Sequence, residues 1–196
     1  MYQIPRPLGL IWLDLKSDKW FQAGLIVKFA FLILFIPLVQ KQWFLPFLAH
    51  LYESPSLTPW TDFLGEGGTS LAFPYGPIMF VSHLPLTFCG WLLDQLFDSQ
   101  YFLGLGFRFT LLIADCFVLL VLLQQFEQSW KKLIIFYWLS PLVLFVTYWH
   151  GQTDLIPVAL FFIAIGYLKR NYQKVGGIIL AFSVAAKHNM LIGVPF

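Results

Sequence analysis

Six apolar segments, most of them close to the length of a membrane-crossing helix, follow one another along this chain and constrain its fold more than any other feature. A helix that spans a bilayer needs about 20 mostly apolar residues. The segments cover residues 23–39, 76–97, 103–123, 133–149, 155–168 and 175–195. Charged residues make up only 11% of the chain, against about 25% in a typical soluble domain. We therefore expect an all-α, polytopic helical membrane protein.

The pattern predicts one transmembrane domain over residues 1–196. Residues 1–20 are mixed rather than apolar, and Trp12 and Trp20 fall at helical spacing opposite Asp14. Such a basic, tryptophan-anchored segment is typical of a helix that lies on the membrane surface. We expect an interfacial helix there, ahead of the first crossing.

A long loop is expected at residues 41–75, which are rich in glycine, proline and acidic side chains and contain short amphipathic pieces. Loops of this length are usually functional. Just before it, Lys28 interrupts the first apolar segment near its start. We expect the Lys28 side chain to snorkel to the interface.

Lysine and arginine concentrate on the cytoplasmic side of membrane proteins, which orients the chain. If residues 76–97 crossed the bilayer fully, most basic residues after them would face outwards. If that segment re-enters or lies along the interface, nearly all basic residues face the cytoplasm. We therefore expect about five full crossings plus one re-entrant or interfacial helix, with a cytoplasmic N-terminus. The 41–75 loop, the 150–154 turn and the outer end of the last helix then share the extracytoplasmic side.

Ionisable side chains at membrane depth are costly and usually functional. Arg108 and Asp115 lie seven residues apart, about two turns, on one face of one helix. Arg108 could hold a phosphate with its fork of donors or could snorkel, whereas Asp115 is expected to join helices by hydrogen bonding. Lys187, next to His188, could face a lipid phosphate or form a structural pair with Asp115.

Four polar side chains crowd the turn from Trp149 to Asp154, between two apolar segments. A helix N-cap would explain Asp154, and Gly151 suits a tight turn. Neither explains His150 and Gln152, which could hydrogen-bond a sugar or a phosphate. The turn is therefore a candidate binding site.

Carboxylates in the 41–75 loop are candidates for a general base, because sugar transfer requires the acceptor hydroxyl to lose its proton. Asp62 and Glu66 flank Gly65 and are the first choices; Glu53 is the third. Each would otherwise simply be solvated. No cysteine and histidine spacing requires a metal, although a divalent metal bridging a carboxylate and a phosphate is an alternative.

The order of these motifs resembles the GT-C superfamily of polyprenyl-phosphate-dependent glycosyltransferases, which includes mannosyltransferases. The matching segments are Phe73 to Pro77, Arg108 to Asp115, Ser140-Pro141, His150 to Asp154, and Lys187. The resemblance implies transfer of a mannose-like hexose from a polyprenyl-phosphate sugar to an acceptor on the extracytoplasmic face. Family members are commonly about twice as long, so we expect this chain to be the N-terminal part of a larger module.

Carried onto this sequence, the resemblance implies that Asp62, or Glu66, is the base. Arg108, Lys187 and His188 would then bind the lipid phosphate. The expected lining of the site consists of Tyr75, His150, Gln152 and Asp154. The membrane would be the plasma or inner membrane of a bacterium, or the endoplasmic reticulum of a eukaryote.

Two other functions fit the same sequence. One is a non-catalytic subunit that binds a lipid carrier or pairs with a second membrane protein. The other is a transporter or flippase component with Asp115 and Lys187 as an intramembrane charge pair. Nucleic-acid binding is not expected, because the chain has no basic run with interleaved aromatic residues.

Overall fold

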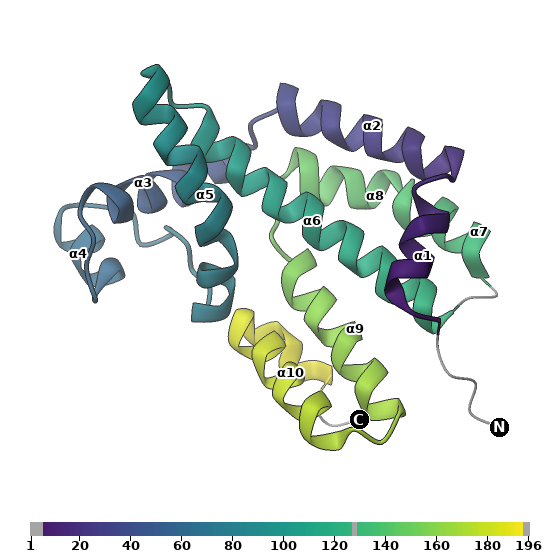
Figure 1. Cartoon of the computed structure of the whole chain (residues 1–196). Helices are drawn as coiled ribbons and strands as arrows, with labels where there is room; N and C mark the ends of the chain where they lie inside the picture. Colours follow the sequence, from purple (N-terminus) through teal and green to yellow (C-terminus); the bar gives the residue numbers. More distant parts are fainter. Residues whose placement is uncertain (1–5, 127–128, 194–196) are drawn as a thin grey trace.

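Helices account for all regular structure in the computed structural model, which describes residues 6–126 and 129–193 (Figure 1). The all-α prediction is confirmed for these residues. The apolar runs form the longer helices, and proline or glycine stands at about half of the breaks between helices.

The central element is α6 (Phe102–Gln125), whose 24 residues make most of their helix contacts with four other helices. Its neighbours are α1 (Leu8–Leu15), α2 (Lys19–Leu34), α5 (Pro77–Phe97) and α9 (Leu155–Lys169). Figure 1 shows α6 running diagonally through the molecule between them. The predicted segment 103–123 is thus a helix, and most of it is buried inside the protein.

Two helical segments in the described part of the chain are long and apolar enough to cross a membrane. One is α6, and the other covers Trp130–Trp149. The second is assembled from α7 (Trp130–Leu133), η3 (Ile134–Trp138), α8 (Pro141–Val143) and η4 (Leu144–Trp149). With 15 residues in α9 and 14 in α10 (Gln173–Ala186), the last two apolar segments form shorter helices. The count of about five crossings stays a prediction.

A short first helix and a separate second helix form at the N-terminal side, as predicted, although the second begins already at Lys19. Asp18 separates them and caps α2, because its carboxylate accepts the backbone N–H groups of Trp20 and Phe21. In α1, Ile11 and Leu15 are buried in the protein core, whereas Trp12 stays 40% exposed. The expected surface helix is therefore docked on the helical core along one of its faces.

The helix α5 is continuous over 21 residues, so the re-entrant form of the prediction for 76–97 is wrong. It packs along the first half of α6: Gly106 lies against the backbone of Leu86, and Gly90 against that of Phe102. Asp94, near the end of α5, accepts the N–H groups that open α6. The alternative of an interfacial helix stays a prediction.

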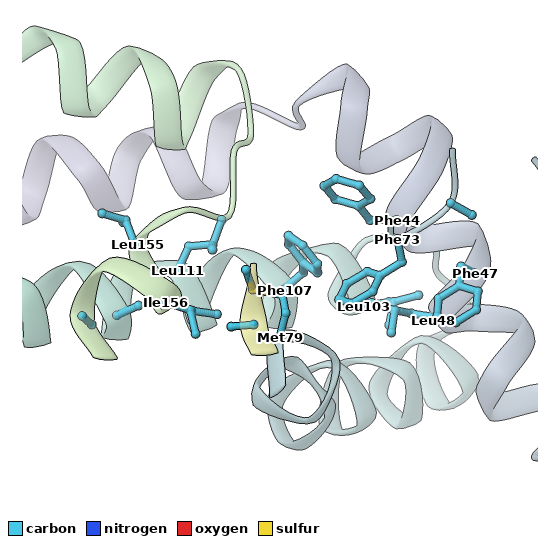
Figure 2. Packing of buried hydrophobic residues seen from close by; sticks show 14 of the residues in the cluster. Phe44, Phe47, Leu48, Phe73, Met79, Leu103, Phe107, Leu111, Leu155 and Ile156 are labelled. Carbon is cyan, nitrogen blue, oxygen red and sulfur yellow. The ribbon is translucent and has the colours of Figure 1, made fainter. Parts of the chain in front are cut away.

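Much of the predicted 41–75 loop is folded. It contains most of η1 (Gln40–Phe44), all of α3 (Leu45–Glu53), and α4 (Pro59–Gly65). Phe47 and Phe73 stack with ring centroids 5.8 Å apart, and Phe44 meets Phe73 edge-on (Figure 2). This aromatic core fixes the turn that follows, at residues 73–76.

The chain closes with α9 and α10, which pack on each other, and with η5 (His188–Gly193). Gly176 lets the two helices approach, since a Cβ there would meet the side chain of Leu168. The Ser183 hydroxyl donates to the carbonyl of Pro157 at 2.8 Å. This pairing brings the end of α10 beside the start of α9.

Candidate functional site

Three predicted residues from distant parts of the chain meet at one end of the bundle, and we call Tyr75, Asp154 and Lys187 the rim cluster. The Lys187 ammonium forms an ion pair with the Asp154 carboxylate. The same ammonium lies 5.5 Å from the centroid of the Tyr75 ring. Side-chain exposures of 20% for Lys187 and 41% for Asp154 place the pair at the protein surface.

Backbone geometry explains how Lys187 reaches this position. The helix α10 ends at Ala186, and Lys187 itself has an extended backbone with φ −152° and ψ 120°. The N–H of Gly76 donates to the carbonyl of Ala186 at 3.3 Å. A side chain at position 76 would collide with the carbonyl oxygen of Ala185, so glycine is required for this approach. The contact holds Tyr75 beside the end of α10.

The turn from Trp149 to Asp154 lies next to the rim cluster, because it ends at Asp154. Gly151 has φ +89°, which favours glycine, and its carbonyl accepts a hydrogen bond from Gln40 Nε2 at 3.5 Å. Gln40 and Thr153 are both 0% exposed, and Gln40 Oε1 and Thr153 Oγ1 have no hydrogen-bond partner among the residues that the structure describes. Buried polar atoms of this kind are usually satisfied. Two buried polar groups at this turn, the Gln40 amide oxygen and the Thr153 hydroxyl, are therefore left without a hydrogen bond among the described residues.

The sequence predictions did not include Gln40 or Thr153. Thr153 belongs to the polar turn that was singled out, and Gln40 opens a short polar run after an apolar segment. No other local feature of the sequence indicates that Gln40 or Thr153 belongs to the site. Their burial depends on the contact between residues 37–40 and Gly151, which are more than a hundred positions apart.

Asp154 does not cap α9 as expected. It stands at the N-cap position, but its side chain makes no capping hydrogen bond and turns to Lys187 instead. Gln152 is half-buried on the same turn, and His150 and His188 are exposed. The structure therefore groups Tyr75, Asp154 and Lys187 closely and leaves the two histidines at the surface.

Arg108 is a buried residue, so the expectation that it snorkels is wrong. Its side chain is 3% exposed, Nε donates to the carbonyl of Gly104 at 2.8 Å, and Nη1 donates to that of Phe35 at 2.6 Å. The guanidinium lies 5.4 Å from the Tyr101 ring, and Nη2 has no partner. These contacts anchor the end of α2 to the start of α6 and leave one donor group unused.

The pair predicted between Asp115 and Lys187 is wrong, and so is the snorkelling of Lys28. Lys28 is 2% exposed and its ammonium lies 2.5 Å from the Asp115 carboxylate. Tyr137 and Tyr148 each donate to the same carboxylate at 2.7 Å, and the Trp138 ring lies 3.7 Å from the ammonium. This network joins α2, α6 and the 130–149 segment, which is a structural role.

The loop acids lie apart from the rim cluster. Asp62 accepts from the Thr58 hydroxyl at 3.3 Å, Glu66 lies 3.0 Å from His50 Nε2, and Glu53 is exposed. The helix α4, which contains Asp62, is linked to the turn that holds Tyr75, because the Trp60 indole donates to the carbonyl of Phe73 at 3.2 Å. In the part of the chain that the structure describes, neither Asp62 nor Glu66 forms a hydrogen bond or ion pair with Lys187.

Basic side chains gather at the opposite end of the bundle. Gln124, at the end of α6, bonds both the carbonyl of Arg6 and the guanidinium of Arg170. The Trp130 indole donates to Asp18, which brings the start of the 130–149 segment to the same place. The basic residues in or next to these segments are Arg6, Lys16, Lys19, Lys131, Lys132, Lys169 and Arg170. The bundle is therefore two-ended, with the rim cluster at one end and this basic end at the other.

A metal finds little support in this geometry. Residues 6–126 and 129–193 contain no group of three or more histidine, cysteine or acidic side chains placed to hold an ion. Asp154, the carboxylate of the rim cluster, already faces an ammonium. The comparisons with known proteins add no relative, since no family model, curated protein or solved structure matches this chain.

Proposed function

We propose that this chain is a multi-pass membrane protein that transfers a mannose-like hexose from a polyprenyl-phosphate donor to an acceptor on the extracytoplasmic face. The observation that carries the proposal is the rim cluster, in which a surface ammonium meets an exposed carboxylate under an aromatic ring. The GT-C resemblance of the motifs gives the reaction class. The rim cluster gives the place where a phosphate would bind.

A phosphate can replace Asp154 on Lys187 at low cost. Ion pairs with solvent access contribute roughly 0–1 kcal/mol, so exchanging one anion for another changes the free energy little. The donor phosphate would take the Lys187 ammonium, and the Tyr75 ring would offer an apolar face to the sugar. The apolar helices below would accommodate the polyprenyl chain.

In the proposed reaction, the acceptor hydroxyl attacks the sugar carbon bonded to the phosphate. The hydroxyl proton passes to a carboxylate, the bond between sugar and phosphate oxygen breaks, and the phosphate leaves with its electron pair. Lys187 stabilises the negative charge that develops on the phosphate. Asp62 is the proposed base, because among the described residues its carboxylate accepts a hydrogen bond only from the Thr58 hydroxyl, whereas Glu66 faces His50.

The proposed orientation follows from the two ends of the bundle. Basic residues favour the cytoplasmic side, so the basic end would face the cytoplasm and the rim cluster the outer side. In this orientation the helix α5, which packs along the first half of α6, would be the interfacial element.

The second candidate function is that of a non-catalytic subunit that binds a lipid carrier or pairs with another membrane protein. One observation favours it: neither Asp62 nor Glu66 contacts the rim cluster in the described residues. Such a subunit would use the same phosphate site without transfer. The transporter alternative loses its support, because Asp115 pairs with Lys28 rather than with Lys187.

The test uses the full chain in liposomes with tritiated polyprenyl-phosphate mannose and a membrane extract as acceptor source. We expect label transfer, and we expect Lys187→Ala to reduce it about 100-fold through loss of charge stabilisation. Lys174→Ala, an exposed lysine on the same helix near its other end, is the matched control and should keep the wild-type rate. Wild-type transfer by Lys187→Ala would overturn the assignment.

Binding of the donor separates the two candidates. Asp62→Asn should abolish transfer and keep donor binding, whereas Lys187→Ala should weaken both. If the wild-type chain binds the donor through Lys187 and transfers nothing, the subunit function is favoured. If it does not bind the donor, both candidates are contradicted.

A further inference from the structure

An apolar groove of about 380 Å³ lies where α1 and α2 meet α6. Its walls come from α1, α2 and α6, and include Trp12, Leu25, Ile113 and Cys116. Within residues 6–126 and 129–193, no charged side chain lines it. In volume it falls within the range of ligand pockets, about 300–1,000 Å³.

The groove is elongated and its two ends differ. Along α6 its lining runs from Phe109 to Leu120, which corresponds to roughly 16 Å of helix. Phe109 meets Phe29 edge-on at 5.6 Å, at the end away from α1. Trp12 lines the other end, where α1 lies against α6. This shape suits one hydrocarbon chain entering beside Trp12.

Two lysines stand at the Trp12 end. Lys16 follows Trp12 by four residues, so both lie on the same face of the chain, and its N–H donates to the Trp12 carbonyl. Lys19 opens α2 two residues before Phe21, whose ring meets Trp12 at 5.9 Å. Both lysine side chains are exposed.

The acids nearby are already engaged. Asp14 forms an ion pair with Arg6 at 2.5 Å. Asp18 accepts the N–H groups that open α2 and the indole of Trp130. Three basic residues, Arg6, Lys16 and Lys19, stand against two acids, Asp14 and Asp18, so the mouth of the apolar groove keeps a net charge of +1. This excess complements an anionic head group attached to a hydrocarbon chain.

We infer that this groove binds one acyl chain of an anionic phospholipid, with the lipid phosphate held by Lys16 and Lys19. The inference rests on the proposed membrane location and is independent of the transfer reaction. The lipid belongs to the cytoplasmic leaflet, whose anionic head groups attract basic segments next to the membrane. A polyprenyl-phosphate donor is excluded as the occupant, because its phosphate site, Lys187, lies at the other end of the bundle.

The experiment is native mass spectrometry of the full chain released from nanodiscs that contain equal amounts of phosphatidylglycerol and phosphatidylcholine. We expect the wild type to retain one phosphatidylglycerol in about tenfold preference, because two lysines face the phosphate. Lys16→Glu/Lys19→Glu should abolish the preference. Lys174→Glu, which reverses an exposed charge on α10, should keep it.

Filling the groove gives a second arm that does not depend on charge. Ile113→Trp, at a residue of the groove wall that is 48% exposed, should lose the retained lipid, whereas Ile178→Trp, on α10 and 56% exposed, should keep it. Both variants should transfer sugar at the wild-type rate if the chain is a transferase, so lipid retention and transfer can fail separately. Equal retention of the two lipids, retention by Ile113→Trp, or displacement of phosphatidylglycerol by polyprenyl phosphate would each overturn the inference.

Discussion

At the scale of single residues, the most consequential contact is the ion pair between Lys28 and Asp115. Both side chains are buried, so each charge has lost its water and depends on the other. Two tyrosine hydroxyls donate hydrogen bonds to the carboxylate, and an indole ring lies against the ammonium. Removing one partner of such a pair costs far more than the pair contributes, because an uncompensated charge stays buried.

Asp115→Asn should therefore destabilise the protein by about 3–5 kcal/mol. The free energy of unfolding in detergent, followed by tryptophan fluorescence, measures the loss. Glu53→Gln, at an exposed carboxylate, is the control and should change little. The double change Lys28→Met/Asp115→Leu should recover part of the stability, because it removes the unpaired charge but leaves the hydroxyls of Tyr137 and Tyr148 without their acceptor. A single change as mild as the control would contradict the structural role.

Asp18 gives a residue-scale prediction on pH. Partial burial favours the neutral form, but hydrogen bonds from the Phe21 N–H, the Trp130 indole and the Trp20 N–H outweigh it and lower the pKa of Asp18 below its ordinary value. A lowered pKa in the folded state means that the cap stabilises fully above the unfolded pKa of about 3.9. That contribution is lost as the pH falls through the folded pKa.

Asp18→Ala should cost about 1 kcal/mol at neutral pH. The difference from wild type should vanish in acid, below the folded pKa, because the wild-type cap is then protonated. Unfolding free energies measured from neutral pH into acid check this, with Asp14→Ala, at the exposed pair with Arg6, as the control. A deficit that persists unchanged in acid would exclude the carboxylate as its cause.

At the scale of elements, close helix packing depends on a few glycines. A Cβ on Gly106 would collide with the backbone of Leu86, so α5 and α6 touch backbone to backbone there. Small residues at helix contacts are the usual means of close approach in membrane bundles. Gly177, in α10, has nothing within 4 Å of where its Cβ would stand.

Gly106→Ala should therefore lower the free energy of unfolding by about 1–3 kcal/mol through overpacking. Gly177→Ala is the matched control and should stabilise α10 by up to about 1 kcal/mol, because alanine is the better helix former. Thermal unfolding in detergent compares the two variants. Equal effects of the two substitutions would argue against the α5–α6 contact.

The sequence predicts elements well where their cause is local. The apolar run at 103–123 became α6, and the polar turn at 149–154 lies at the candidate site, because periodicity and turn chemistry act over a few residues. The 41–75 loop was predicted in part: short amphipathic pieces were expected there and α3 is one of them, but the compact packing of the loop depends on Phe47 meeting Phe73. Lys28 was misassigned for the same reason: its partner lies 87 positions away.

Part of the candidate site could also be predicted from local features of the sequence. Lys187 and Asp154 could be chosen from the sequence because charged groups beside apolar segments are uncommon and costly. Their pairing with each other, and the place of Tyr75 above them, depends on α9 packing against α10 and on Gly76 meeting Ala186. No local pattern contains that information.

At the scale of the whole molecule, the two ends of the bundle differ in charge and chemistry. The rim cluster lies where α9 begins and α10 ends, and the basic residues lie where α9 ends and α2 begins. In the proposed orientation, the two ends face opposite sides of a membrane. The phosphate site, the acceptor side and the lipid groove all depend on this arrangement.

The most direct test is the labelling of single cysteines by a membrane-impermeant maleimide in intact cells and in inverted vesicles. The background replaces Cys89 and Cys116, and one cysteine is placed at His150 or at Lys132, both exposed. We predict that His150→Cys is labelled only from the extracytoplasmic side and Lys132→Cys only from the cytoplasmic side. Labelling of both from the same side, or of His150→Cys from the cytoplasm, would contradict the account.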